Sequence, residues 1–302
     1  MKKLIVIIGP TASKKTTLAH QLALNINGEI INGDVFQMYR DINAGVNKPN
    51  EQQLQEVNYH LLNQLNVLEN YSIFNYQKDF ELTYRTIDKK NKPVILCGGS
   101  HLYLDAIIKG YDLSNSEIQK YYEIVDKWSD DQLIKYLQKY DPISLQKTLN
   151  NFHRMKRAVA YLKANNNQPK YKLEQQNNKP KYNTLVIMTD KAREELYNDI
   201  NHRFDSFFKN NAWIHEVKEL INQYGENIIN SQAFKAIGYR EIAQHLINKC
   251  SLDLEKIKTK TRHLAKHQLT WCNNKFNNKI MFNYENDNFE ALLTKVKKFL
   301  YD

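Results

Sequence analysis

The chain has 302 residues, 42% of them hydrophobic and 11% aromatic, which is enough for one large or two modest packed domains and excludes a disordered protein. The formal net charge of +10 at pH 7 favours a polyanionic partner, because lysines and arginines that face phosphates release condensed counterions, although a lysine-rich composition alone gives the same charge. The longest apolar runs, such as Leu4 to Ile8, are far shorter than the roughly 20 residues of a membrane span. We therefore expect a cytoplasmic protein without a membrane partner, whose three scattered cysteines are reduced.

The first hundred or so residues predict alternating strands and helices. Hydrophobic periodicity predicts strands at 4–8, 29–31 and 93–97 and helices at 16–25 and 101–109. In the first helix, Leu18, Leu22 and Leu24 are expected to face the core. Because parallel strands end at one edge of a sheet, three turns should meet in a single crevice, namely residues 9–16, 32–37 and 98–101.

From about Ser114 the pattern is helical without strands, as far as a polar, lysine-rich stretch over 163–182 that resembles a return linker. Strand character returns over 183–190, and the remainder is mostly helical with one late strand-like segment over 279–284. The sequence therefore predicts an α/β fold with a parallel sheet and a helical insertion. We divide it into a first part of the core (1–113), an insertion with its linker (114–182) and the rest of the core (183–302).

Residues 9–16, "GPTASKKT", follow the first strand as a variant of the phosphate loop GxxxxGK[ST], with Lys14 where the second glycine belongs. The backbone amides of such a loop and the start of the next helix attract a diphosphate, to which Lys15 would add a point charge. The Thr16 hydroxyl would meet a magnesium ion. The alternative is an ordinary strand-to-helix turn with a capped helix start. The missing glycine matters mainly if the turn requires positive φ, where a side chain costs about 1 kcal/mol.

Three further side chains are candidates for the same crevice. Asp34 follows the second strand, where a carboxylate can act as a general base or bind magnesium, or merely cap a turn. Ser100 follows Gly98 and Gly99 and can donate to a reacting oxygen or to a carboxylate. Arg203 carries a guanidinium suited to bidentate phosphate contact, unless it pairs with a neighbouring aspartate.

Basic residues gather in two helical stretches. Arg154 and Arg157 share one helix face and suit an RNA backbone, although a solvated charged face has the same pattern. In "TRHLAKHQLTW" (261–271), Arg262 and Lys266 are four residues apart. The two histidines of that stretch have a zinc-compatible spacing but no evident third ligand, which favours a polar or RNA-facing helix, and its tryptophan is expected in the core.

With these segments in place, the chain resembles the tRNA dimethylallyltransferase family, P-loop enzymes that put a dimethylallyl group on an adenosine beside the anticodon. The resemblance extends over nearly the whole length. The family motifs GPTASGKT, DSxQxY, GTxKP, VGGTGLY, QAIGYKE and TRxxAKRQxTW correspond to residues 9–16, 34–39, 45–49, 97–103, 235–241 and 261–271. This sequence departs from them at Lys14, Val35, Val46, Ser100 and His267.

The resemblance implies a P-loop NTPase-like sheet with helices on both faces and a prenyl transfer reaction. Asp34 would take a proton from the exocyclic amine of the adenine while that nitrogen attacks the allylic carbon, and Ser100 would hold the leaving oxygen or the base. Arg203 and a magnesium ion on Thr16 would stabilise the diphosphate. The diphosphate of dimethylallyl diphosphate would bind along the loop, at Gly9, Pro10, Thr11, Ala12, Ser13, Lys14, Lys15 and Thr16.

The resemblance also implies a grip on the anticodon stem-loop of tRNA by a protein that we expect to be a monomer. The residues expected to bind tRNA are Asp34, Val35, Phe36, Gln37, His153, Arg154, Met155, Lys156, Arg157, Lys235, Arg240, Arg262 and Lys266. Two other functions remain open at this point. One is another enzyme on the same fold, either a prenyltransferase for free adenine nucleotides or a small-molecule kinase. The other is a tRNA-binding protein that has lost catalysis.

Overall fold

A computed structural model describes residues 1–111, 117–169, 180–208 and 211–302 of the chain. It contains two compact units, one formed by Met1–Ile108 together with Lys181–Asp302 and the other by Lys109–Pro180. The second unit therefore begins a few residues before the insertion boundary expected at 114. Half of the lysine-rich linker expected over 163–182, residues 170–179, lies outside the described residues.

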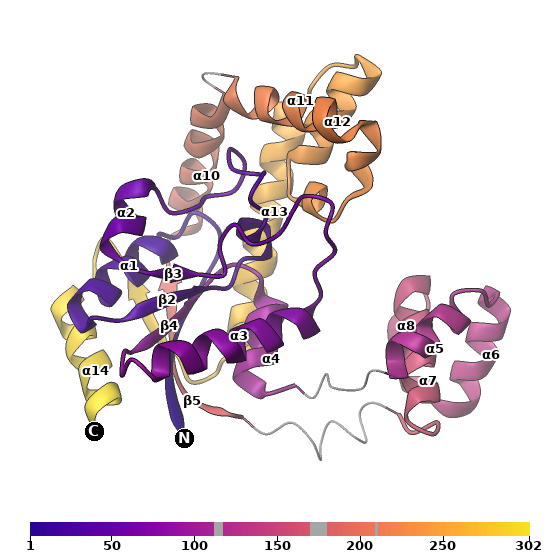
Figure 1. Ribbon diagram of the computed structural model, residues 1–302, viewed down its shortest axis with the longest axis horizontal. Coiled ribbons are helices and arrows are strands. Elements are labelled where there is room, and N and C mark those ends of the chain that lie inside the picture. Colours follow the sequence, from indigo (N-terminus) through magenta and orange to yellow (C-terminus); the bar gives the residue numbers. More distant parts are fainter. Residues whose placement is uncertain (112–116, 170–179, 209–210) are drawn as a thin grey trace. The chain divides into compact units, whose positions relative to one another are not determined.

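The first unit is built on the parallel sheet drawn in Figure 1. Its strand order is β3-β2-β4-β1-β5-β6. The strands are β1 (Lys2–Ile8), β2 (Glu29–Asn32), β3 (Tyr59–His60), β4 (Val94–Cys97), β5 (Tyr182–Asp190) and β6 (Ile280–Asn283). The central β1 pairs with β4 on one side and with β5 on the other. Because both faces of a parallel sheet are covered, β1 is a continuous apolar run rather than an alternating one, which is why the sequence predicts it well.

Successive residues of β1 face opposite layers of helices. Leu4, Val6 and Ile8 belong to the core that includes α3 (Ile73–Asp88) and α4 (His101–Lys109). Ile5 and Ile7 belong to the core that includes α1 (Lys15–Ile26) and α14 (Phe289–Tyr301). The expected α/β fold with helices on both faces is confirmed.

One detail of α1 differs from the sequence prediction. Leu18 and Leu22 are fully buried, but Leu24 is 49% exposed. Residues four apart share a helix face, whereas Leu24 is rotated by about 120° from the direction of Leu18 at 100° per residue. Leu24 therefore faces solvent, and the expectation that it faces the core is wrong.

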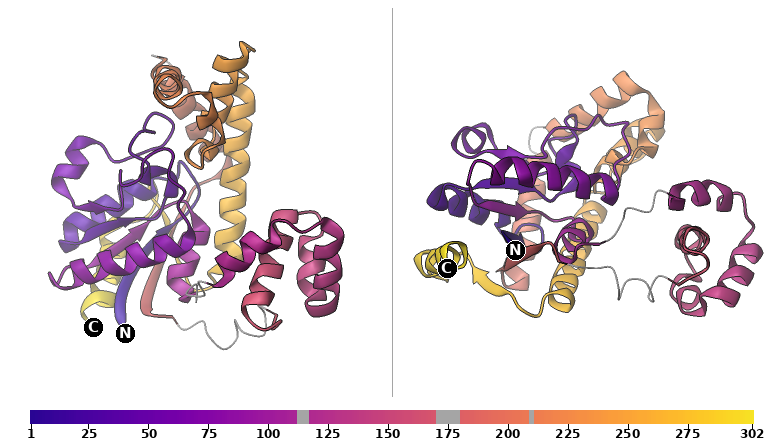
Figure 2. Two further views of the ribbon diagram at one scale, coloured as in Figure 1. Left: turned by 45° about the vertical axis from the view of Figure 1, so that its right-hand side comes forward. Right: turned by 60° about the horizontal axis from the view of Figure 1, so that its bottom comes forward.

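The carboxyl-terminal half adds helices beyond the sheet. They are α10 (Arg193–Phe208), α11 (Ala212–Tyr224), α12 (Tyr239–Asn248) and α13 (Leu254–Lys275), and Figure 2 shows α13 as one unbroken helix beside the α/β layers. Smaller elements are the 3₁₀ helices η1 (Val35–Met38), η2 (Glu226–Asn230) and η3 (Ala233–Lys235) and the short helix α2 (Glu51–Glu56). Trp271, expected in the core, is partly buried against it and stacks on His101 with ring centroids 4.6 Å apart.

The second unit is helical in its described part, with α5 (Glu117–Val125), α6 (Asp130–Tyr140), α7 (Pro142–Thr148) and α8 (Phe152–Ala164). It has its own small apolar core, made of Val125, Leu133, Leu137, Met155, Val159 and Leu162. Met155 has no exposed surface. The expectation that its side chain contacts tRNA is therefore wrong, because that side chain packs in the core of the second unit, on the inner face of α8.

Among the described residues, no helix combines the length and apolar character needed to cross a membrane.

Candidate active site

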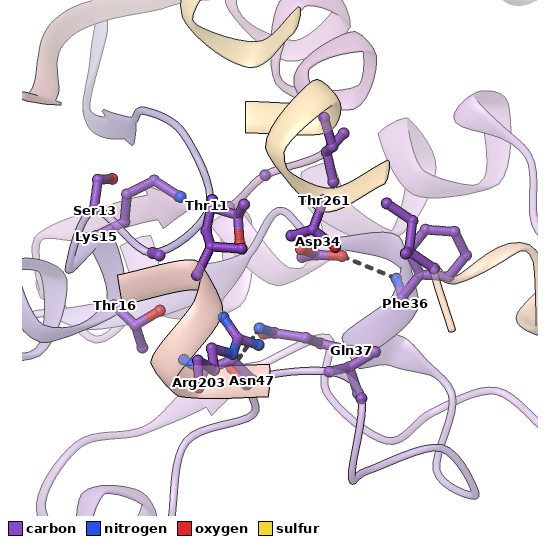
Figure 3. A pocket seen from close by; sticks show the side chains of 18 of the residues that line it. Thr11, Ser13, Lys15, Thr16, Asp34, Phe36, Gln37, Asn47, Arg203 and Thr261 are labelled. Atoms are coloured by element: carbon purple, nitrogen blue, oxygen red, sulfur yellow. Dashed lines mark hydrogen bonds between the residues drawn. The ribbon is translucent and has the colours of Figure 1, made fainter. Parts of the chain in front are cut away.

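A cavity opens beyond the carboxyl ends of β1, β2 and β4, where the three turns predicted to converge do meet (Figure 3). Its empty volume is about 1170 Å³ when the open solvent at its mouth is included. Polar side chains come from the turns, including Lys15, Thr16 and Asp34, and α10 adds Arg203. Apolar surface comes from Phe36, Val46, Ile200, Phe204, Phe207, Ala236, Ile237 and Leu264.

The loop after β1 enters α1 through left-handed backbone conformations. Ala12 and Lys14 have positive φ values of 65° and 60°, so the chain adopts left-handed conformations twice before α1 begins. Gly9 has φ 143°, and a Cβ there would lie 2.3 Å from the Thr189 hydroxyl oxygen. The alternative of an ordinary capped helix start is wrong, because α1 has no side-chain cap hydrogen bond and its N-cap residue is left-handed. The departure at Lys14 therefore occurs where a glycine would relieve strain.

Most of the predicted diphosphate-binding residues face the cavity. Thr11 to Thr16 line it, whereas Gly9 and Pro10 are buried and do not. The Ser13 hydroxyl donates to the Pro10 carbonyl at 2.8 Å, which closes the turn. The Lys15 ammonium also donates to the Pro10 carbonyl. The loop is thus folded on itself and leaves the amides at the start of α1 available to an anion, as helix amino-termini are.

Asp34 both caps a turn and lines the cavity. Its Oδ1 accepts a hydrogen bond from the Phe36 N–H at 3.1 Å, so the carboxylate does cap η1. It also lines the cavity (Figure 3). A Cβ at Gly99 would lie 3.2 Å from Asp34 Oδ2, so the absence of a side chain at Gly99 leaves space beside the second carboxylate oxygen. One oxygen is held in place and the other faces the cavity region.

Ser100 and Val35 differ from expectation. Ser100 Oγ accepts a hydrogen bond from the Val35 N–H at 3.0 Å, and the wall of the cavity at this turn is formed by Gly98 and Gly99 instead. Ser100 therefore supports the turn that carries Asp34, and its contact with the leaving oxygen or the base stays a prediction. The Val35 side chain is 8% exposed, so it packs into the core rather than toward a base. Phe36 and Gln37 do line the cavity.

Arg203 is on α10 and points into the cavity, with its guanidinium carbon 5.0 Å from the centre of the Phe207 ring (Figure 3). The alternative that it pairs with Asp199 is wrong, because that carboxylate lies 2.6 Å from the Lys191 ammonium. A guanidinium stacked on an aromatic face keeps its donors in a defined plane.

Three ionisable groups of the cavity influence one another. Burial raises the pKa of the Asp34 carboxyl, while the Phe36 N–H and the charges of Lys15 and Arg203 act to lower it. Burial lowers the pKa of Lys15, and negative charge on Cys97 or Asp34 acts to raise it. Burial also lowers the pKa of Arg203, against the attraction of Asp34. An anion in this cavity would stabilise the charged forms of both cations.

Gln268 is a site residue that we did not single out from the sequence. Its Oε1 accepts from the Thr11 N–H at 2.7 Å, and its Nε2 donates to the Gly99 carbonyl at 3.0 Å. The side chain is 6% exposed and comes from α13. It therefore joins the phosphate loop to the turn after β4. Its position within "TRHLAKHQLTW" was the available signal, but we attributed that stretch to RNA contact.

The loop that lines the cavity at Gly45, Val46 and Asn47 is held by two charged side chains. The Lys48 ammonium donates to the Tyr39 carbonyl and to two asparagine side chains at 2.6–2.7 Å, and burial lowers its pKa to about 8. The Glu216 carboxylate accepts from the backbone N–H groups of residues 43 and 44 at 3.0 Å. Gln37 Nε2 donates to the Asn47 carbonyl at 2.7 Å, which fixes one wall of the cavity.

The basic residues expected to bind tRNA in the first unit fall into two groups. Lys235 and Lys266 are exposed. Arg240 and Arg262 bond within the protein, Arg240 to a backbone carbonyl at 3.3 Å and Arg262 to Asn201 at 3.0 Å. The two arginines therefore support the helices around them.

In the second unit, Arg154 and Arg157 are exposed on α8. The neighbouring basic residues have partners inside the unit. A His153 ring nitrogen lies 2.7 Å from the Tyr122 hydroxyl, and the Lys156 ammonium lies 2.8 Å from an aspartate carboxylate. The two arginines are the members of this cluster most available to a polyanion.

Known proteins are similar to this chain over nearly its whole length. The family model described as IPP transferase matches residues 37–275. The chain is 39% identical over 303 residues to a tRNA dimethylallyltransferase of Malacoplasma penetrans (strain HF-2), covering 100% of this chain and 99% of that one. It is 31% identical over 308 residues to a tRNA dimethylallyltransferase of Mycoplasmoides gallisepticum, covering 99% and 97%. A crystal structure of a tRNA delta(2)-isopentenylpyrophosphate transferase from Staphylococcus epidermidis is similar with a TM-score of 0.69, 29% identity and coverage of 99% and 98%.

Proposed function

This chain belongs to the IPP transferase family, and from that premise we propose how its cavity transfers a dimethylallyl group to tRNA. The chain is an enzyme, a transferase that acts in tRNA modification. The observation that carries the proposed mechanism is a carboxylate, Asp34, that shares one cavity with Lys15, Arg203 and a phosphate loop. Such a set can hold an anionic leaving group and accept a proton at the same time.

In the proposed complex, the diphosphate of dimethylallyl diphosphate lies on the loop from Thr11 to Thr16, with Lys15 and Arg203 beside it. The geometry that supports this is the left-handed loop at the start of α1, where helix amides and the helix dipole favour an anion. The dimethylallyl group would contact apolar side chains of α10, such as Phe204. The negative charge that develops on the leaving diphosphate is stabilised by donors that are already oriented.

Asp34 is proposed as the general base. The exocyclic amine of the adenine forms a bond to the allylic carbon, the bond from that carbon to the diphosphate oxygen breaks, and the amine proton passes to Asp34 Oδ2. Oδ1 keeps its hydrogen bond to the Phe36 N–H, which holds the carboxylate in orientation. Ser100 supports the same turn through Val35.

The residues present fit a magnesium ion. Thr16 and Asp34 both line the cavity, and magnesium is commonly held by one or two protein oxygens, several waters and the phosphates of the substrate rather than by a full protein cage. We propose that Thr16 holds it together with the diphosphate. When bound, the ion would neutralise part of the charge on the departing diphosphate.

The acceptor is proposed to be the adenosine on the 3′ side of the anticodon, in a single-stranded loop where a base leaves its stack at low cost. Phe36 and Gln37 line the cavity beside Asp34 and are available to the base. Arg154 and Arg157 in the helical unit and Lys235 and Lys266 in the first unit are the exposed cations proposed to contact the phosphates of the stem-loop. A cytoplasmic location and a monomeric state stay predictions.

The test is transfer of the prenyl group in vitro. Unmodified tRNA incubated with the protein, dimethylallyl diphosphate and magnesium should yield prenylated adenosine by nucleoside mass spectrometry, and the Asp34→Ala variant should not. Free adenine nucleotides should give no product. If tRNA binds but calorimetry detects no binding of dimethylallyl diphosphate, the chain is a tRNA-binding protein that has lost catalysis, and the mechanism proposed here is wrong.

A further inference from the structure

Lys14 occupies a position of the phosphate loop where a side chain is strained. Its φ and ψ are 60° and 23°, directly before the first residue of α1. A residue other than glycine persists in this conformation when its surroundings hold it there. Two contacts are available for that purpose. The Lys14 ammonium lies 3.0 Å from Glu285 Oε1 and 5.4 Å from the centre of the Tyr284 ring. Both partners lie just after β6, far from the loop in sequence.

Glu285 is shared between two lysines. Its Oε1 also lies 2.9 Å from the ammonium of Lys191, which follows β5 and has a side chain only 9% exposed. The same ammonium lies 2.6 Å from Asp199 Oδ2 on α10. Four charges thus form one chain of ion pairs, Lys14, Glu285, Lys191 and Asp199. Its two ends are the phosphate loop and α10.

The far end of this chain reaches the helix that carries Arg203. Asp199 and Arg203 are four residues apart on α10, which places them on the same helix face one turn apart. A single exposed ion pair contributes little, and the side chains of Lys14 and Glu285 are each about two-fifths exposed. The partly buried Lys191 at the centre makes the connection more than a surface pair, because its side chain is only 9% exposed and its ammonium has two carboxylate partners.

We propose that Glu285 is a positioning residue for diphosphate binding. Through Lys14 it holds the phosphate loop in its left-handed turn, and through Lys191 and Asp199 it ties that loop to the helix that presents Arg203. The inference rests on the proposed function, because it assigns the loop and Arg203 to the same diphosphate. Glu285 itself does not line the cavity and does not contact the substrate in this scheme.

The test is a double-mutant cycle of Glu285→Gln and Lys14→Gly, read out as the dissociation constant for inorganic diphosphate and for dimethylallyl diphosphate with magnesium. Glycine adopts positive φ without a side-chain contact to hold it there, so diphosphate binding by the Lys14→Gly variant should no longer depend on Glu285. With Lys14 present, Glu285→Gln should weaken binding by about three- to tenfold, the range expected for a partly buried ion-pair network. In the Lys14→Gly background, the same change should weaken binding by less than about twofold.

Glu290→Gln is the matched control, since Glu290 carries the same charge, is exposed and lies five residues further along the chain. Steady-state kinetics should show a higher KM for dimethylallyl diphosphate in Glu285→Gln, with the KM for tRNA and the melting temperature unchanged. If Glu285→Gln weakens diphosphate binding equally with Lys14 and with Lys14→Gly, the proposal is overturned. Tighter diphosphate binding by Glu285→Gln would also overturn it, because Glu285 would then merely keep the Lys14 charge away from the ligand. Binding of inorganic diphosphate needs no turnover, so this result is independent of whether tRNA is prenylated.

Discussion

Gln268 offers the most direct test of how the site is assembled. Its side-chain amide makes two hydrogen bonds, to the Thr11 N–H at 2.7 Å and to the Gly99 carbonyl at 3.0 Å. In Gln268→Met, a side chain of similar length remains, but the Thr11 N–H loses its acceptor, while the Gly99 carbonyl keeps the hydrogen bond that it accepts from the His101 N–H at 3.1 Å. An unsatisfied buried polar group costs about 1–3 kcal/mol, and the Thr11 N–H becomes such a group, so we expect the free energy of unfolding to fall by about 2 kcal/mol.

The expected effect on catalysis is larger than the effect on stability. A loss of about 2 kcal/mol should lower the melting temperature by about 4–8 °C in a unit of this size. The two turns that Gln268 joins carry the phosphate loop and one wall beside Asp34, and a displacement of about 1 Å between reacting groups can cost on the order of 100-fold in rate. We therefore expect kcat/KM to fall by about 100-fold at a temperature where the variant is fully folded.

The assay combines thermal unfolding with transfer kinetics on the same preparations. Thr270→Ala is the control on the same helix, because that exposed hydroxyl bonds only to the Lys266 carbonyl in its own helix, and its loss should change neither quantity appreciably. Gln268→Glu retains an acceptor for the Thr11 N–H but places a carboxylate near the diphosphate, so its KM for dimethylallyl diphosphate should rise further. A Gln268→Met variant that loses stability but keeps kcat/KM within about twofold would refute the reasoning.

Four other predictions concern the site and the proposed tRNA contacts. Asp34→Asn should lower the single-turnover rate by at least about 100-fold without weakening diphosphate binding. Since burial raises the pKa of Asp34 and the base must be ionised, the wild-type rate should fall with decreasing pH through a pKa above the ordinary value of 3.8; a flat profile down to that pH would contradict this. Arg203→Lys should raise the KM for dimethylallyl diphosphate by about tenfold, because an ammonium cannot reproduce the bidentate fork; an unchanged KM would remove Arg203 from the diphosphate site. The double variant Arg154→Ala with Arg157→Ala should weaken tRNA binding. The slope of log affinity against log salt concentration, measured by filter binding across a salt series, should fall by about one unit for each phosphate that the protein no longer neutralises. An unchanged slope would show that α8 does not contact tRNA phosphates.

The sequence predicted the components of the site well where a single local pattern was enough. Gly9 to Thr16 and Asp34 follow apolar strands, and the ends of parallel strands meet at one edge, so their convergence follows from the sequence pattern alone. The sequence pattern was less successful in predicting which way individual side chains point. Ser100, Val35 and Met155 occupy the expected elements, but their contacts depend on which neighbours pack against them.

The sequence by itself determined the α/β class, the helical insertion, the motif of the phosphate loop and the family. The reason is that the alternation of strands with helices, the spacing of motif residues and the distribution of charge are all local properties of the sequence. Only the tertiary structure decided what joins these parts. Gln268 bridges two turns, one of them 169 residues away from it in sequence, and Glu285 reaches Lys14 across 271 residues. Contacts between such distant positions arise from the packing of α13 and the turn after β6 against the sheet, and no local pattern encodes them.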